Sequence, residues 1–122
     1  MRRILLVAIC IFGSLPRSSL AHGVTIIEIR NVIHANSLAG IVTFRDPSDG
    51  VPGVVVEDCT RGWAKVVETS LTDENGNFKL PAANRRSVHY LRISKVGWDT
   101  LLVKVMIDRR AGELVLNLRP ST

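Results

Sequence analysis

The sequence predicts an all-β fold, a seven-stranded antiparallel β-sandwich. Short apolar runs recur through residues 38–118, and Gly, Pro, Asp and Asn separate them. Several runs alternate between apolar and polar residues, which places every second side chain on one face. The clearest examples are Leu101, Val103, Val105 and Ile107 in one run and Leu114, Leu116 and Leu118 in another. Runs of this length and spacing are typical of two stacked antiparallel sheets.

Each strand is expected where an apolar run lies between two turn-forming segments. The seven expected strands are residues 38–44, 54–58, 65–72, 77–80, 88–94, 100–107 and 113–118. Residues 24–33 alternate less regularly, and we expect an extra N-terminal edge strand there, with a short helix as the alternative. Trp98 follows Gly97 at a junction between strand and turn, and we expect it to close one end of the core.

The stretch TDENGNFKLP, residues 72–81, resembles a metal-binding loop at first sight. An EF-hand loop beginning at Asp73 would need glycine at the sixth position and glutamate at the twelfth, whereas Gly76 is the fourth residue. Asn75 and Gly76 tolerate the positive φ values that tight hairpin turns demand. We therefore predict the tip of a β-hairpin.

The first 21 residues have the pattern of a secretory signal peptide. Arg2 and Arg3 precede an apolar run over residues 4–15, and Ser19-Leu20-Ala21 carries small residues at the cleavage positions. The run is too short for a membrane-spanning helix. We expect cleavage after Ala21 and a periplasmic or secreted protein without a transmembrane segment.

Removal of this segment changes the charge of the chain. Without Arg2, Arg3 and Arg17, 13 of the 16 Lys and Arg residues remain against 11 Asp and Glu residues, a net charge of +2 instead of +5. So small an excess does not favour nucleic-acid binding. Cys59 is the only cysteine left, so an internal disulfide is excluded, and we expect a buried thiol rather than a link to another chain.

The order of the turn motifs resembles the carboxypeptidase regulatory-like family, whose small sandwich is similar to transthyretin. The resemblance covers residues 38–118, between an N-terminal extension (22–37) and a C-terminal tail (119–122). Trp98 departs from the family pattern, which more often has tyrosine there. The motifs are Gly40-Ile-Val42, Asp46…Gly50-Val-Pro52-Gly53-Val54, Thr72-Asp73-Glu-Asn-Gly76-Asn-Phe78 and Leu91-Arg-Ile93-Ser94…Gly97-Trp98.

This resemblance implies a non-catalytic binding or accessory module without a cofactor. Its partner would be a protein or glycan of the cell envelope. The related transthyretin-like hydrolases end in Tyr-Arg-Gly-Ser, but this chain ends in LRPST. The resemblance therefore does not imply that hydrolase activity.

A basic end is the best candidate for partner binding. If consecutive strands reverse direction, the turns at 59–64, 81–87 and 108–112 meet at one end of the sandwich, and the acidic turns at 45–53, 73–76 and 95–99 meet at the other. Arginines bind phosphate, sulfate and carboxylate groups, and an exposed tryptophan can stack on a sugar. Solvated loops without a ligand are the alternative. The candidate residues are Arg61, Trp63, Arg85, Arg86, Arg109 and Arg110.

The alternative function is copper binding. Cleavage after Ala21 would leave His22 at the N-terminus, where its amine and imidazole could chelate copper(II). The same strand order places His34 and His89 at the basic end and His22 at the acidic end, so the three imidazoles would not converge. We expect His89 to be a partly buried, hydrogen-bonded residue, and calcium binding by Asp46, Asp49 and Asp73 has no supporting spacing.

Overall fold

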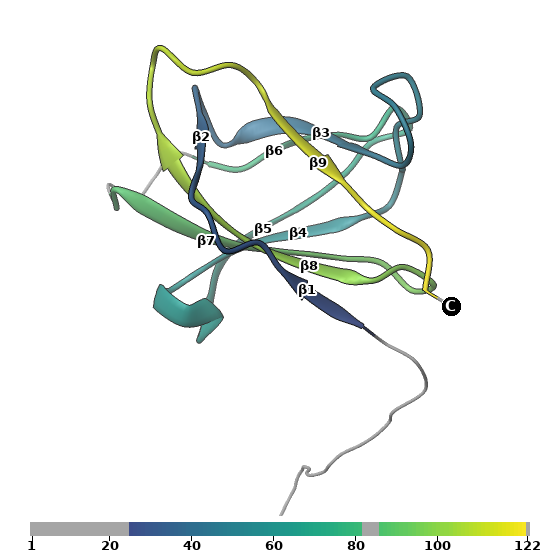
Figure 1. Ribbon diagram of the computed structural model, residues 1–122, viewed down its shortest axis with the longest axis horizontal. Helices are drawn as coiled ribbons and strands as arrows, with labels where there is room; N and C mark the ends of the chain where they lie inside the picture. Colours follow the sequence, from purple (N-terminus) through teal and green to yellow (C-terminus); the bar gives the residue numbers. More distant parts are fainter. Residues whose placement is uncertain (1–24, 82–85, 122) are drawn as a thin grey trace, which may run out of the picture.

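The computed structural model describes residues 25–81 and 86–121, and it shows an all-β fold built from two sheets. The strand order of the larger sheet is β1-β8-β7-β4-β5, with β2 also paired to β8, and that of the smaller sheet is β6-β3-β9. Figure 1 shows the two sheets as facing layers. This arrangement is consistent with the predicted β-sandwich, and no α-helix occurs in the part of the chain just defined.

The strands occupy all seven predicted runs. Their bounds are β1 (Ile26–Glu28), β2 (Ile33–Ala35), β3 (Ala39–Thr43), β4 (Val55–Cys59), β5 (Val66–Leu71), β6 (Asn77–Lys79), β7 (Val88–Ser94), β8 (Thr100–Ile107) and β9 (Leu114–Asn117), and a short 3-10 turn, η2 (Arg61–Trp63), follows β4. The predicted N-terminal edge strand is present as two short strands, β1 and β2, and the helical alternative for this segment is wrong for residues 25–33. Among the described residues, no helix is long and apolar enough to cross a membrane.

The prediction of a fully antiparallel fold is wrong in two places. β1 and β2 both run parallel to β8, and β3 runs parallel to β9. A short connection makes two strands antiparallel only where they follow one another in the same sheet. Here the chain repeatedly crosses from one sheet to the other, and strands from distant parts of the sequence become neighbours.

The stretch around Gly76 forms the predicted turn, but not a hairpin. Gly76 has φ +84° and its N–H donates to Asp73 O at 3.0 Å, while Asp73 N–H donates to Asn77 O at 2.9 Å. The strands on either side then separate, because β5 pairs with β4 in the larger sheet and β6 pairs with β3 in the smaller one. The hydroxyl of Thr72 stabilises the corner by donating to Val51 O at 2.7 Å.

The core lies between the sheets and follows the predicted alternation. Leu101, Val103 and Val105 of β8 are buried, as are Leu114, Leu116 and Leu118 around β9. Ile107, predicted to share that face, is 38% exposed because it lies at the end of β8, opposite Ala35. The remaining core residues include Val42, Val54, Val56, Phe78, Leu80, Leu91 and Ile93.

One end of the core is closed as expected by Trp98. Its ring packs edge-on against Phe44 with centroids 5.2 Å apart. Residues 119–121, predicted as a tail, are hydrogen-bonded to the β7–β8 turn: Asp99 N–H donates to Arg119 O at 2.8 Å, and Ser121 N–H donates to Gly97 O at 2.9 Å. They are therefore part of the fold.

Gly76 and Gly97 offer a matched test of the sheet-to-sheet corner. Both have strongly positive φ, but an added Cβ at Gly76 would lie 2.5 Å from Val42 O, whereas none of the surrounding atoms comes within 4 Å of one at Gly97. We expect Gly97→Ala to lower the free energy of unfolding by about 1 kcal/mol through backbone strain alone. Gly76→Ala should cost at least about 2 kcal/mol more, because the corner must move apart. Urea denaturation measures both, and equal losses would contradict the close packing at Gly76.

Candidate functional site

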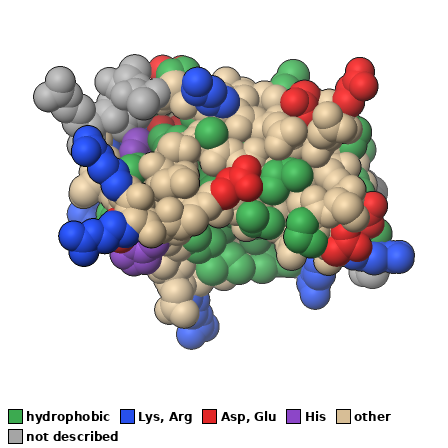
Figure 2. All heavy atoms as spheres, turned by 90° about the horizontal axis from the view of Figure 1, so that it is seen from above, with side chains coloured by type: hydrophobic (Ala, Val, Ile, Leu, Met, Phe, Trp, Pro, Cys, Tyr) green, Lys and Arg blue, Asp and Glu red, His purple; other side chains and the backbone are tan. Residues whose placement is uncertain are grey.

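Three chain segments meet at the end of the sandwich that the sequence predicted to be basic. In the register of the larger sheet, Cys59 lies opposite Tyr90, Val88 opposite Met106, and Ala35 opposite Ile107. The 3-10 turn η2, the start of β7 and the β8–β9 turn therefore lie at the same end. Figure 2 shows several Lys and Arg side chains at one end, and most visible Asp and Glu side chains toward the other end, where Lys and Arg side chains also occur.

A groove of about 350 Å³ opens at this basic end, and we call it the Arg61 groove. It is lined by Arg61, Arg86, Ser87, Val88 and Tyr90. Arg61 is exposed, while Arg86 and Tyr90 are half-buried. Two arginines, a serine, a valine and a tyrosine thus border one concave surface.

The position of Arg61 depends on Trp63, which folds η2 back onto the larger sheet. The indole Nε1–H donates to Leu91 O at 2.9 Å, and the ring packs edge-on against Tyr90 with centroids 5.2 Å apart. Gly62 and Trp63 have φ values of +70° and +57°, a left-handed turn that is unfavourable for tryptophan. The hydrogen bond and the ring contact hold this conformation, so Trp63 supports the groove. Trp63 was predicted to be exposed, but it is half-buried.

Arg86 is held by a buried network between β4 and β7. Its Nη2 lies 3.0 Å from Asp58 Oδ1, and its Nη1 donates to Cys59 O at 2.5 Å. The opposite carboxylate oxygen, Asp58 Oδ2, lies 3.0 Å from His89 Nδ1. The side chain of Asp58 is fully buried and that of His89 is 3% exposed.

The network follows from strand alternation. Asp58 and His89 occupy core-facing positions of β4 and β7, where Val56 and Leu91 also point inward. Buried polar groups need partners, and each of these two supplies one to the other. The prediction that His89 is a hydrogen-bonded strand residue is confirmed. Asp58 compensates the charge of Arg86, and Arg61 is the more exposed cation of the groove.

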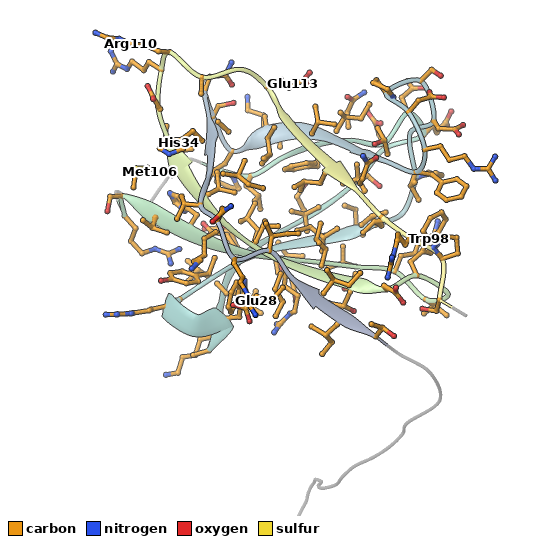
Figure 3. The ribbon with its side chains drawn as sticks, viewed as in Figure 1. Glu28, His34, Trp98, Met106, Arg110 and Glu113 are labelled. Atoms are coloured by element: carbon orange, nitrogen blue, oxygen red, sulfur yellow. The ribbon has the colours of Figure 1, made fainter. Side chains whose placement is uncertain are left out.

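Arg109 and Arg110 lie at the same end but do not line the groove. Both are exposed on the β8–β9 turn, where Arg110 N–H donates to Asp108 Oδ1 at 3.0 Å. Figure 3 shows Arg110 at the tip of this turn, across the larger sheet from η2. Of the predicted site residues, the structure therefore brings together Arg61, Trp63 and Arg86. Arg109 and Arg110 lie apart from them. Arg85 lies outside the described residues.

Ser87 and Tyr90 line the groove, although neither was predicted from the sequence as a site residue. Tyr90 alternates with the inward-facing His89 and Leu91, and this parity could have shown that its ring points outward. Its contact with Trp63 could not be predicted, because it requires the left-handed turn at Gly62 and Trp63.

The structure offers little support for metal binding within its described residues. His22, the proposed copper ligand, lies outside them, and His34 is exposed on β2, opposite Met106 (Figure 3). In residues 25–81 and 86–121, no group of three or more His, Cys, Asp or Glu residues is placed to hold an ion. At the acidic end, Asp73 Oδ1 accepts hydrogen bonds from the N–H groups of Asn75 and Asn77, both at 2.9 Å.

Cys59 is a buried thiol, as predicted. Its side chain has no exposed surface, and it forms no disulfide. Burial raises the pKa of the thiol, and the nearby Arg92 guanidinium opposes this effect only in part. Because the thiolate is the nucleophilic form, Cys59 is poorly suited to covalent chemistry at neutral pH.

Comparison with known proteins does not place the chain in a family. No protein-family model matches it, and no curated protein matches it either. The resemblance to the carboxypeptidase regulatory-like family therefore remains an expectation from the order of the turn motifs.

Adjacent carboxylates on β4 provide a test of the buried network. Asp58→Asn removes the charge facing Arg86 and His89, and we expect a loss of about 3 kcal/mol of folding free energy, since breaking a buried pair leaves its partners uncompensated. Glu57→Gln breaks the more exposed pair with Arg92, whose Nε–Oε1 distance is 2.7 Å, and should cost less than about 1 kcal/mol. Chemical denaturation measures both losses. Similar losses would show that the Asp58 network does not hold β4 and β7 together.

The reactivity of Cys59 tests its burial. In a Cys10→Ser background, we expect alkylation at pH 8 to be at least about 100-fold slower in the folded protein than in denaturant, because the folded thiol is inaccessible and its pKa is raised. Since the neutral thiol is favoured in the folded state, Cys59 should contribute stability that decreases as the pH rises above its unfolded-state pKa. Alkylation kinetics followed by mass spectrometry measure the difference between the two rates. Equal rates in the folded and the denatured protein would contradict the burial of Cys59.

Proposed function

We propose that this protein is an exported, non-catalytic binding module of the carboxypeptidase regulatory-like type. In this proposal, β3 to β9 form a transthyretin-like core, and β1 and β2 are an addition at its edge. The two facing sheets and the order of the turn motifs support the proposal. The start of β1 at Ile26, shortly after the proposed cleavage site at Ala21, is compatible with export.

The Arg61 groove is the proposed binding site, and its composition is the observation that carries the proposal. The exposed Arg61 borders the same hollow as Arg86 and Tyr90. Guanidinium groups bind carboxylate, sulfate and phosphate through paired hydrogen bonds, and an adjacent aromatic ring can pack on a sugar. These features suit an anionic group of a glycan or protein partner in the cell envelope.

The rigidity of the groove favours binding over chemistry. Trp63, Asp58 and Cys59 O hold the groove-lining residues through hydrogen bonds and a ring contact, so that little ordering is needed when a ligand arrives. His89, the titratable side chain closest in sequence to Tyr90, has its Nδ1 at Asp58 and is only 3% exposed. It is therefore poorly placed to reach a bound substrate.

A charge reversal in the groove tests this function. Binding of a sulfated oligosaccharide at low ionic strength should weaken at least about tenfold in Arg61→Glu, since an attractive charge is replaced by a repulsive one. Arg45→Glu is the matched control: Arg45 is also an exposed arginine, and it lies on the loop between β3 and β4 at the acidic end, remote from the groove. We expect this control to bind within about twofold of the unmodified protein.

Calorimetric titration with the oligosaccharide is a suitable measurement, with circular dichroism to show that both variants fold. Equal weakening in the two variants would indicate a general charge effect. Unchanged affinity in Arg61→Glu would exclude the Arg61 groove as the binding site.

A further inference from the structure

The larger sheet ends in a long open edge at β5. One side of β5 pairs with β4, and no described strand pairs with its other side. Val67 and Leu71 on this strand are 43% and 63% exposed. The strand itself contains no proline or lysine, and its one charge, Glu68, lies beside the core-facing Asp58 in the ladder with β4. Proline and outward-facing lysine, two common means of preventing strand addition, are therefore missing from β5.

The hydrogen-bonding groups that face the open edge follow from the β4–β5 ladder. Thr72 N–H donates to Val54 O at 3.0 Å, immediately beyond the end of the strand. Paired residues alternate along an antiparallel ladder, so Ser70 and Glu68 direct their backbone groups toward β4. Thr69 and Leu71 consequently direct theirs toward the open edge. A bulge in the ladder near Val67 marks the limit of this regular segment.

The side chains of this segment also divide into two sets. Thr69 and Leu71 lie opposite Glu57 and Val55, on the face of the sheet away from the core, and Val67, at the bulge, is also exposed. Glu68 and Ser70 are half-buried on the other face. An added strand would therefore meet an apolar row on one face and a polar row on the other.

We propose that a second copy of this chain binds here, through antiparallel pairing of β5 with β5 about a two-fold axis at Thr69. This register places Thr69 opposite Thr69 of the other copy and Val67 opposite Leu71. Thr69 is a hydrogen-bonding position of the open edge, where facing residues exchange their backbone bonds. Cross-strand pairs of threonine and of apolar residues are favourable.

Charge selects this register over its neighbour. With the axis at Thr69, Glu68 of each copy lies opposite Ser70 of the other. With the axis moved to Glu68, the two Glu68 carboxylates would face one another directly, which is unfavourable. Moving the axis to Ser70 would instead place Val67 opposite Asp73 and lose the contact between Val67 and Leu71.

The other edges of the molecule match β5 less well. β1 and β2 have three residues each and are interrupted by Arg30 and Asn31, while β6 has three residues and contains Lys79. β9 has four residues. β5 has six, so its best-matched strand within the described chain is β5 of a second copy. Pairing of an edge with itself closes the assembly as a dimer.

Sedimentation analysis of the full chain over a concentration series tests the proposal. We expect a dimer, and Thr69→Pro should weaken it at least about tenfold, because proline removes an edge N–H without removing a bond to β4. Leu71→Lys should have a similar effect by placing a charge in the apolar row. Val115→Lys is the matched control: Val115 is 46% exposed on β9, an edge of the other sheet, and its substitution should leave the dimer unchanged.

Disulfide trapping tests the register in a Cys10→Ser background. Facing Cα atoms of a hydrogen-bonded pair lie about 5.5 Å apart, which is within the range of a disulfide. Thr69→Cys should therefore form a covalent dimer on mild oxidation. Ser70→Cys should not, because each Ser70 lies opposite Glu68 of the other copy.

Each of three results would overturn the proposal. The first is a protein that stays monomeric across the concentration series, whether or not a strand from a different protein binds at β5. The second is a dimer that Thr69→Pro and Leu71→Lys leave unchanged while both variants remain folded. The third is an assembly larger than a dimer, which would indicate pairing between two different edges.

Discussion

The buried carboxyl group of Asp58 organises the basic end of this protein. It lies between Arg86 and His89, and it links β4 to the beginning of β7 next to the last backbone pair of these two strands, Cys59 with Tyr90. A carboxyl group in this position is costly unless its oxygens are occupied, and both have partners here. Because Arg86 is tied to Asp58 and to Cys59 O, the wall of the Arg61 groove is ordered without a ligand.

The same end contains a second, conformational constraint. The left-handed residues Gly62 and Trp63 reverse the chain after β4 and return η2 to the outer face of the larger sheet. The indole N–H bond to Leu91 O and the Tyr90 contact stabilise this reversal. Buried charge on the inner face and aromatic packing on the outer face thus act on the same two strands, and the groove lies where they meet.

Predictions from the sequence succeeded where a single strand or turn determined the result. All seven strand ranges, the burial of Cys59, the turn at Gly76 and the closing of one end by Trp98 depend on alternation or local turn geometry. The hairpin at residues 72–81 was wrong because β5 and β6 belong to different sheets. Arg109 and Arg110 were predicted to join the site because their turn lies at the same end of the sandwich as the groove. Two turns at the same end can still lie on different surfaces, and these two arginines do not line the groove.

The amino-acid sequence by itself determined which residues face the core, since strand geometry gives every second side chain the same direction. It also determined where the chain turns, because Gly, Pro and Asp favour backbone conformations that strands exclude. The tertiary structure alone decided the strand partners, the parallel pairing of β3 with β9 and the contacts of Asp58. These depend on segments distant in the chain, and their pairing is selected by the packing of the whole core rather than by local preference.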